Sequence, residues 1–233
     1  MRSYGQYCPV AKASEVLGDR WTLLIVSELI AGANRFNDLA RGLPRISRPL
    51  LAQRLRALEA AGVVERRPGL TAGSSSYHLT TAGEELGPLI RGLAEWGARW
   101  AFAEPQPDEL DPILLLWWMR GRINRRALPS QRVVIRFDFD QCSGAYWLIL
   151  KTDDVSVCLQ DPGFTTDLAV HADLTAMFEV WLGRITLKEA QAAETVKVRG
   201  LPALTRALPS WLELAPIAYA VPRAPRGEQR AAR

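Results

Sequence analysis

The chain has 233 residues, of which 48% are hydrophobic and 23% are charged, a balance that excludes fibrous and disordered proteins. The length suits two domains of about 100–130 residues each. The longest apolar run, Ile113–Met119, is far shorter than the roughly 20 residues of a membrane helix, and the N-terminus lacks the apolar core of a signal peptide. Three scattered cysteines and two histidines argue against a disulfide framework and a His-rich metal site. We therefore expect a cytoplasmic protein with no membrane association, no metal and no cofactor.

Positive charge is concentrated in the first half of the chain. Residues 1–103 hold 13 Lys and Arg against 9 Asp and Glu, whereas residues 104–233 are balanced at 16 of each. Eight arginines fall within residues 34–67, namely Arg35, Arg41, Arg45, Arg48, Arg54, Arg56, Arg66 and Arg67. Arginine donates bidentately to phosphate and to guanine edges, so nucleic-acid binding is one interpretation. A solvated surface is the other, and charge alone leaves both open.

Apolar residues recur at three- and four-residue steps over residues 11–30 and predict two helices. The sequence Gly18-Asp19-Arg20 separates them, and Asp19 is the expected N-cap of the second helix. After the turn at residues 32–34, Asn34 is the expected cap of a short helix that contains Phe36 and Leu39.

The next predicted helix, over residues 48–61, has two unlike faces. Ser47 is its expected N-cap, Pro49 is tolerated in its first turn, and Gly62 ends it. One face, at 100° per residue, carries Leu51, Leu55 and Leu58. The opposite face carries Pro49, Ala52, Gln53 and Arg56, with Arg48 at the flank. Small residues permit close approach, and Gln and Arg contact base edges, so this face suits a major groove.

Residues 63–80 predict a β-hairpin, with Arg66 and Arg67 at its base and a Gly-Ser-rich tip. A final helix follows, and four of its apolar residues recur at i, i+4, i+7 and i+11: Leu89, Leu93, Trp96 and Trp100. That spacing suits packing against a second copy of the chain. Packing within the same chain fits the spacing equally well.

Residues 5–100 resemble the HxlR family of dimeric winged helix-turn-helix transcription regulators. The motifs that carry the resemblance are Cys8-Pro9-Val10, Gly18-Asp19-Arg20-Trp21-Thr22-Leu23-Leu24-Ile25, Arg35-Phe36-Asn37-Asp38-Leu39, Gln53-Arg54-Leu55, Gly62-Val63-Val64-Glu65-Arg66 and Leu79-Thr80. The resemblance implies a winged helix of the MarR/HxlR type, in which the helix after Ser47 is the recognition helix, the hairpin is the wing and the terminal helices dimerise. Its expected DNA contacts are Arg35, Ser47, Arg48, Pro49, Ala52, Gln53, Arg54, Arg56, Arg66 and Arg67, with Arg54 at a phosphate.

Cys8 has two interpretations. Some members of the resembled family use a cysteine at this position to sense electrophiles or oxidants, which would make Cys8 a redox sensor. Alternatively, Cys8 is a small buried hydrophobic residue at a dimer interface. The nearest cation along the chain, Lys12, lies four residues away.

The second half begins with a polar, proline-bearing linker over residues 104–111. Asp111 is the expected cap of a helix, after which strict alternation over residues 132–140 predicts a strand with Val133, Ile135 and Phe137 on one face. Three further strands, two helices, a fifth strand and a closing helix predict an α+β domain over residues 112–220, with a mainly antiparallel sheet covered by helices on one face. Residues 221–233 are the expected disordered tail.

Residues 112–216 are similar to sterol-carrier-protein-like domains. The similarity rests on Tyr146-Trp147-Leu148, Val155-Ser156-Val157-Cys158, Asp161-Pro162, Asp167-Leu168, Trp181-Leu182-Gly183, Val196-Lys197-Val198-Arg199-Gly200 and Trp211-Leu212. It implies an apolar tunnel between sheet and helices that binds a hydrophobic small-molecule effector. Candidate lining residues are Trp117, Trp118, Trp147, Phe178 and Trp181, although aromatic residues at such spacing also serve as ordinary core.

The sequence therefore predicts a homodimeric regulator that binds double-stranded DNA. No nucleophile elbow, dinucleotide fingerprint, P-loop or zincin motif occurs in it, so no catalytic residue is assigned. A rival hypothesis is a carrier of lipids or other hydrophobic ligands whose winged helix serves protein contacts. A third, an acyl- or acetyl-transferring enzyme, needs a catalytic domain for which this sequence has no room.

Overall fold

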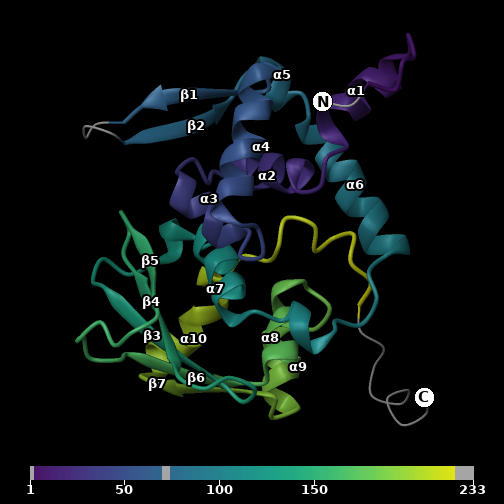
Figure 1. The fold of residues 1–233 in the computed structure, drawn as a ribbon. Helices are drawn as coiled ribbons and strands as arrows, with labels where there is room; N and C mark the ends of the chain where they lie inside the picture. The colour runs from purple at the N-terminus through teal and green to yellow at the C-terminus, as the bar shows by residue number, and fades with distance from the viewer. Residues whose placement is uncertain (1–2, 70–73, 224–233) are drawn as a thin grey trace. The chain divides into compact units, whose positions relative to one another are not determined.

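The computed structural model describes residues 3–69 and 74–223 and divides into two compact units, Met1–Leu93 and Ala94–Arg233 (Figure 1). The division falls inside one helix, α6 (Gly87–Trp100). The domain boundaries expected near residues 103 and 112 stay predictions. Most of the predicted tail, from residue 224 onward, lies outside the described residues. Within the described ranges, no helix is both long and apolar enough to cross a membrane.

The first unit begins with four helices. These are α1 (Pro9–Leu17), α2 (Thr22–Ile30), α3 (Phe36–Gly42) and α4 (Arg48–Ala60). The apolar faces of α2, α3 and α4 form one core that includes Ile25, Leu39 and Leu55. The helices predicted over residues 11–61 are therefore confirmed.

In the first unit, two of the predicted helix caps are wrong and one is confirmed. The N-cap of α2 is Trp21, which makes no side-chain cap, and the carboxylate of Asp19 binds Arg54 instead. The N-cap of α3 is Arg35, whereas Asn34 accepts a backbone hydrogen bond from Tyr77 through its carbonyl at 2.7 Å. Ser47 does cap α4, because its Oγ accepts a hydrogen bond from the backbone N–H of Leu50.

The predicted hairpin is formed by the antiparallel strands β1 (Val64–Pro68) and β2 (Ser75–Leu79). Its tip, residues 70–73, lies outside the described residues. Ser76 of β2 also pairs with Arg35, so the segment before α3 borders the hairpin. The short helix α5 (Thr81–Glu84) then leads into α6.

The second unit is an α+β domain built on a five-stranded sheet. Its strands are β3 (Val133–Phe139), β4 (Ala145–Leu150), β5 (Val155–Cys158), β6 (Leu168–Ala172) and β7 (Val196–Gly200). They lie in the order β5-β4-β3-β6-β7, and every pair is antiparallel except β3 with β6. The helices are α7 (Pro112–Gly121), α8 (Leu174–Trp181), α9 (Leu187–Ala192) and α10 (Pro202–Trp211).

The core of the second unit lies between one face of the sheet and these helices. Alternate residues of β3, including Ile135 and Phe137, are buried there with Leu116 of α7 and Met177 of α8. Asp111 caps α7 as predicted, since its carboxylate accepts hydrogen bonds from the first backbone N–H groups of that helix. Helix capping and the alternation of buried residues along the strands therefore determine the helices and strands that carry the candidate sites.

Candidate nucleic-acid interface

Helix α4 separates its residues into a buried and an exposed face, as predicted. Leu51, Leu55 and Leu58 are almost completely buried in the core of the first unit. The opposite side is an exposed line of residues at i, i+4, i+7 and i+11, which we call the α4 stripe: Pro49, Gln53, Arg56 and Ala60. Ala52 is half-buried at its edge, and Ala60 was missed, although the same spacing extends to it.

The polar side chains of the α4 stripe are available to an external partner. Within the described part of the chain, neither Gln53 nor Arg56 makes a side-chain hydrogen bond or ion pair. An amide and a guanidinium can both contact base edges bidentately, the amide at adenine and the guanidinium at guanine. The stripe therefore presents two groups that are able to contact base edges, beside two small residues.

Arg48 lies at the first turn of α4 and links that helix to α3. Its Nη2 donates to Oδ1 of Asn37 at 2.7 Å, and its guanidinium carbon lies 5.0 Å from the ring centroid of Phe36. Arg48 is nevertheless exposed, as is the capping residue Ser47. Both predicted contacts therefore lie at the surface where the two helices meet.

Arg54 occupies a different environment from the other arginines of α4. Its Nη1 donates to the carboxylate of Asp19, and its Nε donates to the backbone carbonyl of Arg20 at 3.2 Å. Only 17% of the side chain is exposed. The guanidinium of Arg54 thus binds the corner between α1 and α2, where Trp21 adopts a left-handed conformation with φ of 80°.

Three further predicted arginines lie at the hairpin. Ser76 pairs with Arg35 on one side and with Arg67 on the other, so these two residues flank one position of β2. Arg67 donates to the carboxylate of Glu65, whereas the exposed Arg66 has no polar side-chain partner among the described residues. The structure thereby brings Arg35, distant in sequence, beside the tip end of the paired strands. The prediction that Arg67 lies at the base of the hairpin is wrong, because Val64 pairs with Leu79 there and Arg67 is one pair from the other end.

Helix α6 carries the four residues predicted at a helix–helix seam. Leu89, Leu93, Trp96 and Trp100 are 63%, 50%, 58% and 70% exposed, and we call them the α6 seam. Leu86 and Ile90, by contrast, pack against the core of the first unit. The described part of the chain therefore does not bury the α6 seam, and a large apolar surface of this kind is typical of an interaction site.

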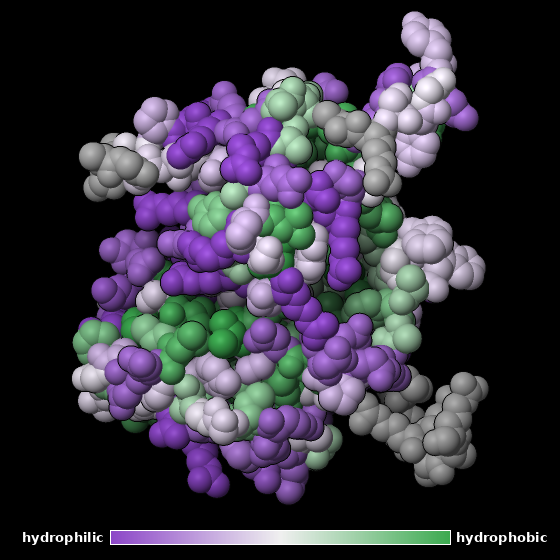
Figure 2. Space-filling model, in the orientation of Figure 1, coloured by the Kyte–Doolittle hydropathy of each residue, from purple (hydrophilic) through white to green (hydrophobic). Residues whose placement is uncertain are grey.

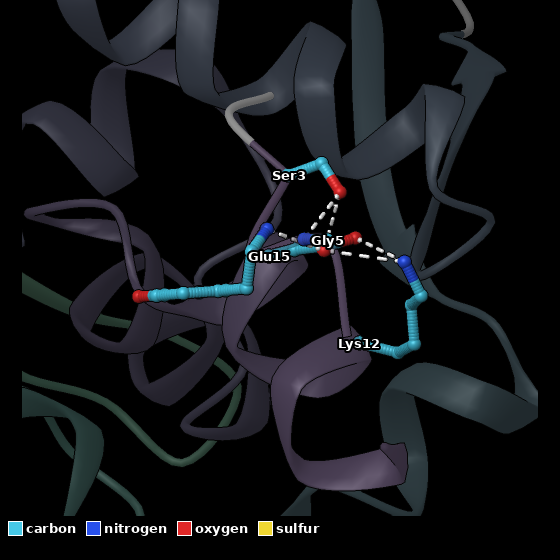
Figure 3. A network of polar contacts seen from close by, with 5 residues as sticks. Ser3, Gly5, Lys12 and Glu15 are labelled. Carbon is cyan, nitrogen blue, oxygen red and sulfur yellow. Dashed lines mark hydrogen bonds and ion pairs between the residues drawn. The ribbon is translucent and has the colours of Figure 1, made fainter. Parts of the chain in front are cut away.

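Cys8 is half-buried at the N-cap of α1 and makes no side-chain cap. Figure 3 shows a polar network between α1 and the segment before it, in which Glu15 accepts hydrogen bonds from the hydroxyl of Ser3, the backbone N–H of Tyr4 and the ammonium of Lys12. The Tyr4 N–H, with Lys12, lowers the pKa of Glu15. Lys12 is the cation nearest to Cys8 along the chain, and its ammonium is paired with the carboxylate of Glu15 at 3.1 Å. Both interpretations of Cys8 stay predictions.

The second unit contains a cavity of about 280 Å³ among its helices. It is lined by Met119, Met177, Val180, Trp181, Gly183, Ile185, Thr186, Leu187, Pro209, Leu212, Glu213, Leu214 and Arg223. We call it the helix cavity. Most of its lining residues are apolar. Two of them are methionines, whose flexible side chains adapt to ligands of varied shape.

Of the five aromatic residues predicted to line a ligand site, the structure places Trp181 in the helix cavity. Trp118 and Phe178 pack edge to face at 6.5 Å between ring centroids. Trp117 lies under the guanidinium of Arg120. Figure 2 shows hydrophobic residues at the surface among hydrophilic ones. Trp147 alternates with the core residues of β4, so it lies on the other face of the sheet. No group of three potential metal ligands occurs among the described residues.

The family of HxlR-like helix-turn-helix proteins matches residues 16–105 of the chain. The helix-turn-helix-type transcriptional regulator YvaP of Bacillus subtilis is 36% identical over 97 residues, which cover 41% of this chain and 90% of YvaP. A helix-turn-helix-type transcriptional regulator of Mycobacterium bovis is 41% identical over 100 residues, 42% of this chain and 61% of that relative. Among solved structures, the reduced transcriptional regulator YodB of B. subtilis is 31% identical, with a TM-score of 0.36, over 41% of this chain and 95% of YodB.

The matched region begins at the last two residues of α1 and covers α2, α3, α4, the hairpin and α6, so it includes the whole α4 stripe and the α6 seam. It excludes the second unit beyond residue 105. Since YvaP is matched along nine-tenths of its length, the similarity extends to a whole regulator rather than to a fragment. Through its first hundred residues, the chain belongs to the HxlR-like helix-turn-helix family of transcriptional regulators.

Proposed function

We propose that this chain is a homodimeric, sequence-specific DNA-binding transcription regulator of the cytoplasm that inserts the α4 stripe into the major groove. The observation that carries the proposal is the arrangement of α4, in which Gln53 and Arg56 are exposed opposite the buried leucines. A recognition helix has this arrangement, because its inner face holds it on the domain and its outer face reads base edges.

The other arginines have distinct proposed roles. Arg48, together with Ser47, lies at the N-terminal end of α4, where a helix terminus favours a phosphate. Arg35, Arg66 and Arg67 bind the DNA backbone beside the hairpin. Arg54, which the sequence suggested as a phosphate contact, instead positions α4 through its bonds to Asp19 and Arg20.

The α6 seam is the proposed dimer interface. Its four large apolar residues lie along one helix and are all at least half exposed. A twofold dimer places two α4 stripes about one turn of DNA apart, a spacing of roughly 34–36 Å.

For the second unit we propose a sterol-carrier-like ligand-binding domain that receives a hydrophobic small-molecule effector. The mainly antiparallel sheet with helices on one face supports this, as does the helix cavity. The same cavity favours the rival function, a carrier of hydrophobic ligands whose winged helix contacts protein. The salt dependence of binding distinguishes the two functions. The affinity for DNA, bound through several arginines, falls steeply as the salt concentration rises, whereas the affinity for an apolar ligand barely changes.

Substitution of the two base-reading residues tests the DNA-binding proposal. We expect Arg56→Ala and Gln53→Ala each to weaken binding to a selected genomic site by about 1–3 kcal/mol and to relax its sequence preference. Fluorescence anisotropy against the selected site and against a scrambled duplex measures both effects. The matched control is Arg126→Ala, which removes another exposed arginine, from the second unit. Unchanged affinity and preference in both α4 variants would contradict the proposed recognition helix.

A further inference from the structure

The turn between α8 and α9 forms one wall of the helix cavity and is tightly packed. Gly183 and Ile185 of this turn line the cavity. Gly183 has φ of +72°, and a Cβ built there would lie 3.2 Å from the side chains of both Leu214 and Ala218. The turn is therefore packed closely against Leu214 and Ala218, so a shift of the turn must move these neighbours as well.

Arg184 belongs to the same turn and is bonded to the segment that follows α6. Its Nη2 lies 3.0 Å from Oε1 of Glu104, and its side chain is only 12% exposed, whereas that of Glu104 is 69% exposed. Its backbone N–H donates to the carbonyl of Glu179 in α8. Arg184 is therefore fixed to the body of the second unit, and Glu104 reaches it from the surface.

The guanidinium of Arg184 is incompletely bonded. Its Nε is buried and has no hydrogen-bond partner among the described atoms. A buried donor without a partner costs free energy, so the observed position of Arg184 depends on its pairing with Glu104. Displacement of the turn would alter that pairing first.

A second contact joins the cavity wall to α6 itself. The hydroxyl of Tyr219 hydrogen-bonds the carboxylate of Glu95 on α6, and Tyr219 follows Ala218, which packs against Gly183. Glu95 directly precedes Trp96 of the α6 seam. All of these residues belong to the second unit, so two contacts tie the end of α6 to the walls of the helix cavity.

We propose that the Arg184–Glu104 ion pair is a clasp through which occupancy of the helix cavity controls the end of α6. This proposal rests on the proposed function, in which the cavity receives a hydrophobic effector and the α6 seam dimerises. A small, uncharged, apolar molecule in the cavity displaces residues 183–187, draws Arg184 away from Glu104 and releases the segment after α6. The released helix end carries Trp96 and Trp100, so dimerisation and operator binding weaken.

The test uses 1-decanol as the apolar probe on the full chain. Hydrogen exchange followed by mass spectrometry reports on residues 101–110, and intrinsic fluorescence, compared with that of Trp181→Phe, reports on binding of 1-decanol in the cavity. In the unsubstituted protein we expect 1-decanol to accelerate exchange in residues 101–110 and to weaken operator binding at least about fivefold. In Arg184→Met and Glu104→Lys, exchange is fast from the start and does not respond, although 1-decanol still binds.

Glu194→Lys is the matched control, because Glu194 is an exposed carboxylate paired with Lys197 at 3.7 Å in the same unit. We expect it to respond to 1-decanol as the unsubstituted protein does. Normal responses in both clasp variants would overturn the clasp while leaving DNA binding intact. Absence of 1-decanol binding in the unsubstituted protein would overturn the cavity assignment and the clasp together. Should Arg184→Met fail to fold, Glu104→Lys, at a surface position, decides the question alone.

Discussion

Arg54→Met is expected to destabilise the first unit and weaken operator binding, while leaving the salt dependence of binding unchanged. The substitution keeps an apolar stem of similar length but removes the bonds to Asp19 and to the carbonyl of Arg20. The pair is intermediate between a buried and a surface pair, since Arg54 is 17% and Asp19 51% exposed. A loss of about 1–3 kcal/mol in the free energy of unfolding follows, to be measured by urea denaturation.

Salt dependence separates a positioning role for Arg54 from a phosphate contact. Loss of one phosphate contact lowers the slope of log affinity against log salt by about one. We expect that change for Arg66→Ala, whose side chain is exposed and unpaired among the described residues, and not for Arg54→Met. Affinity measured between about 50 and 200 mM salt gives the slopes.

Asp19→Asn supplies the matched half of the same experiment. It should cause part of the destabilisation by Arg54→Met, because it removes the charge of the Asp19 contact and leaves the bond to the carbonyl of Arg20. The double variant should be no less stable than Arg54→Met alone. Equal slopes for Arg54→Met and Arg66→Ala, both below that of the unsubstituted protein, would contradict the positioning role and restore Arg54 to the DNA backbone.

The environment of Arg54 also shows which structural features cannot be predicted from the sequence. The two faces of α4, the Ser47 cap and the hairpin depend on neighbours within a few residues, so periodicity and capping rules predicted them correctly. The partner of Arg54 is 35 residues away, and no local pattern links it to Asp19. The error at α2 has a different cause, since the helix begins at Thr22 with Trp21 as its N-cap, two residues after Asp19.

The candidate ligand site could be predicted only in part, since one of the five proposed aromatic residues, Trp181, lines the helix cavity. Composition marks aromatic residues as candidates but does not say which side of a strand or helix faces a cavity. Trp147 alternates with the core residues of β4, so strand periodicity could have excluded it. The methionines and the glycine turn that line the helix cavity are brought together by α7, α8 and α10, and such a set has no signature along the chain.

The spacing of the α6 seam residues fits packing against the same chain and packing against a second copy equally well. Their exposure in the structure favours a second copy. We expect the double variant Leu93→Glu and Trp96→Glu to be monomeric and to lose tight operator binding. Large apolar residues at the centre of an interface each contribute about 2 kcal/mol or more. Sedimentation velocity gives the oligomeric state, and anisotropy gives operator affinity.

Symmetry makes this effect large. In a twofold dimer each substitution occurs twice, and four carboxylates would face one another across the α6 seam, so a loss well above about 4 kcal/mol, or roughly a thousandfold in dimer stability, is expected. Leu159→Glu is the control, because Leu159 is 52% exposed and Leu93 is 50% exposed, yet Leu159 lies outside α6. A double variant that stays dimeric and binds its operator normally would place the interface on another surface. If the double variant is monomeric but still folded, the α6 seam stabilises the dimer and not the fold of the first unit. The core of that unit is built from α2, α3 and α4.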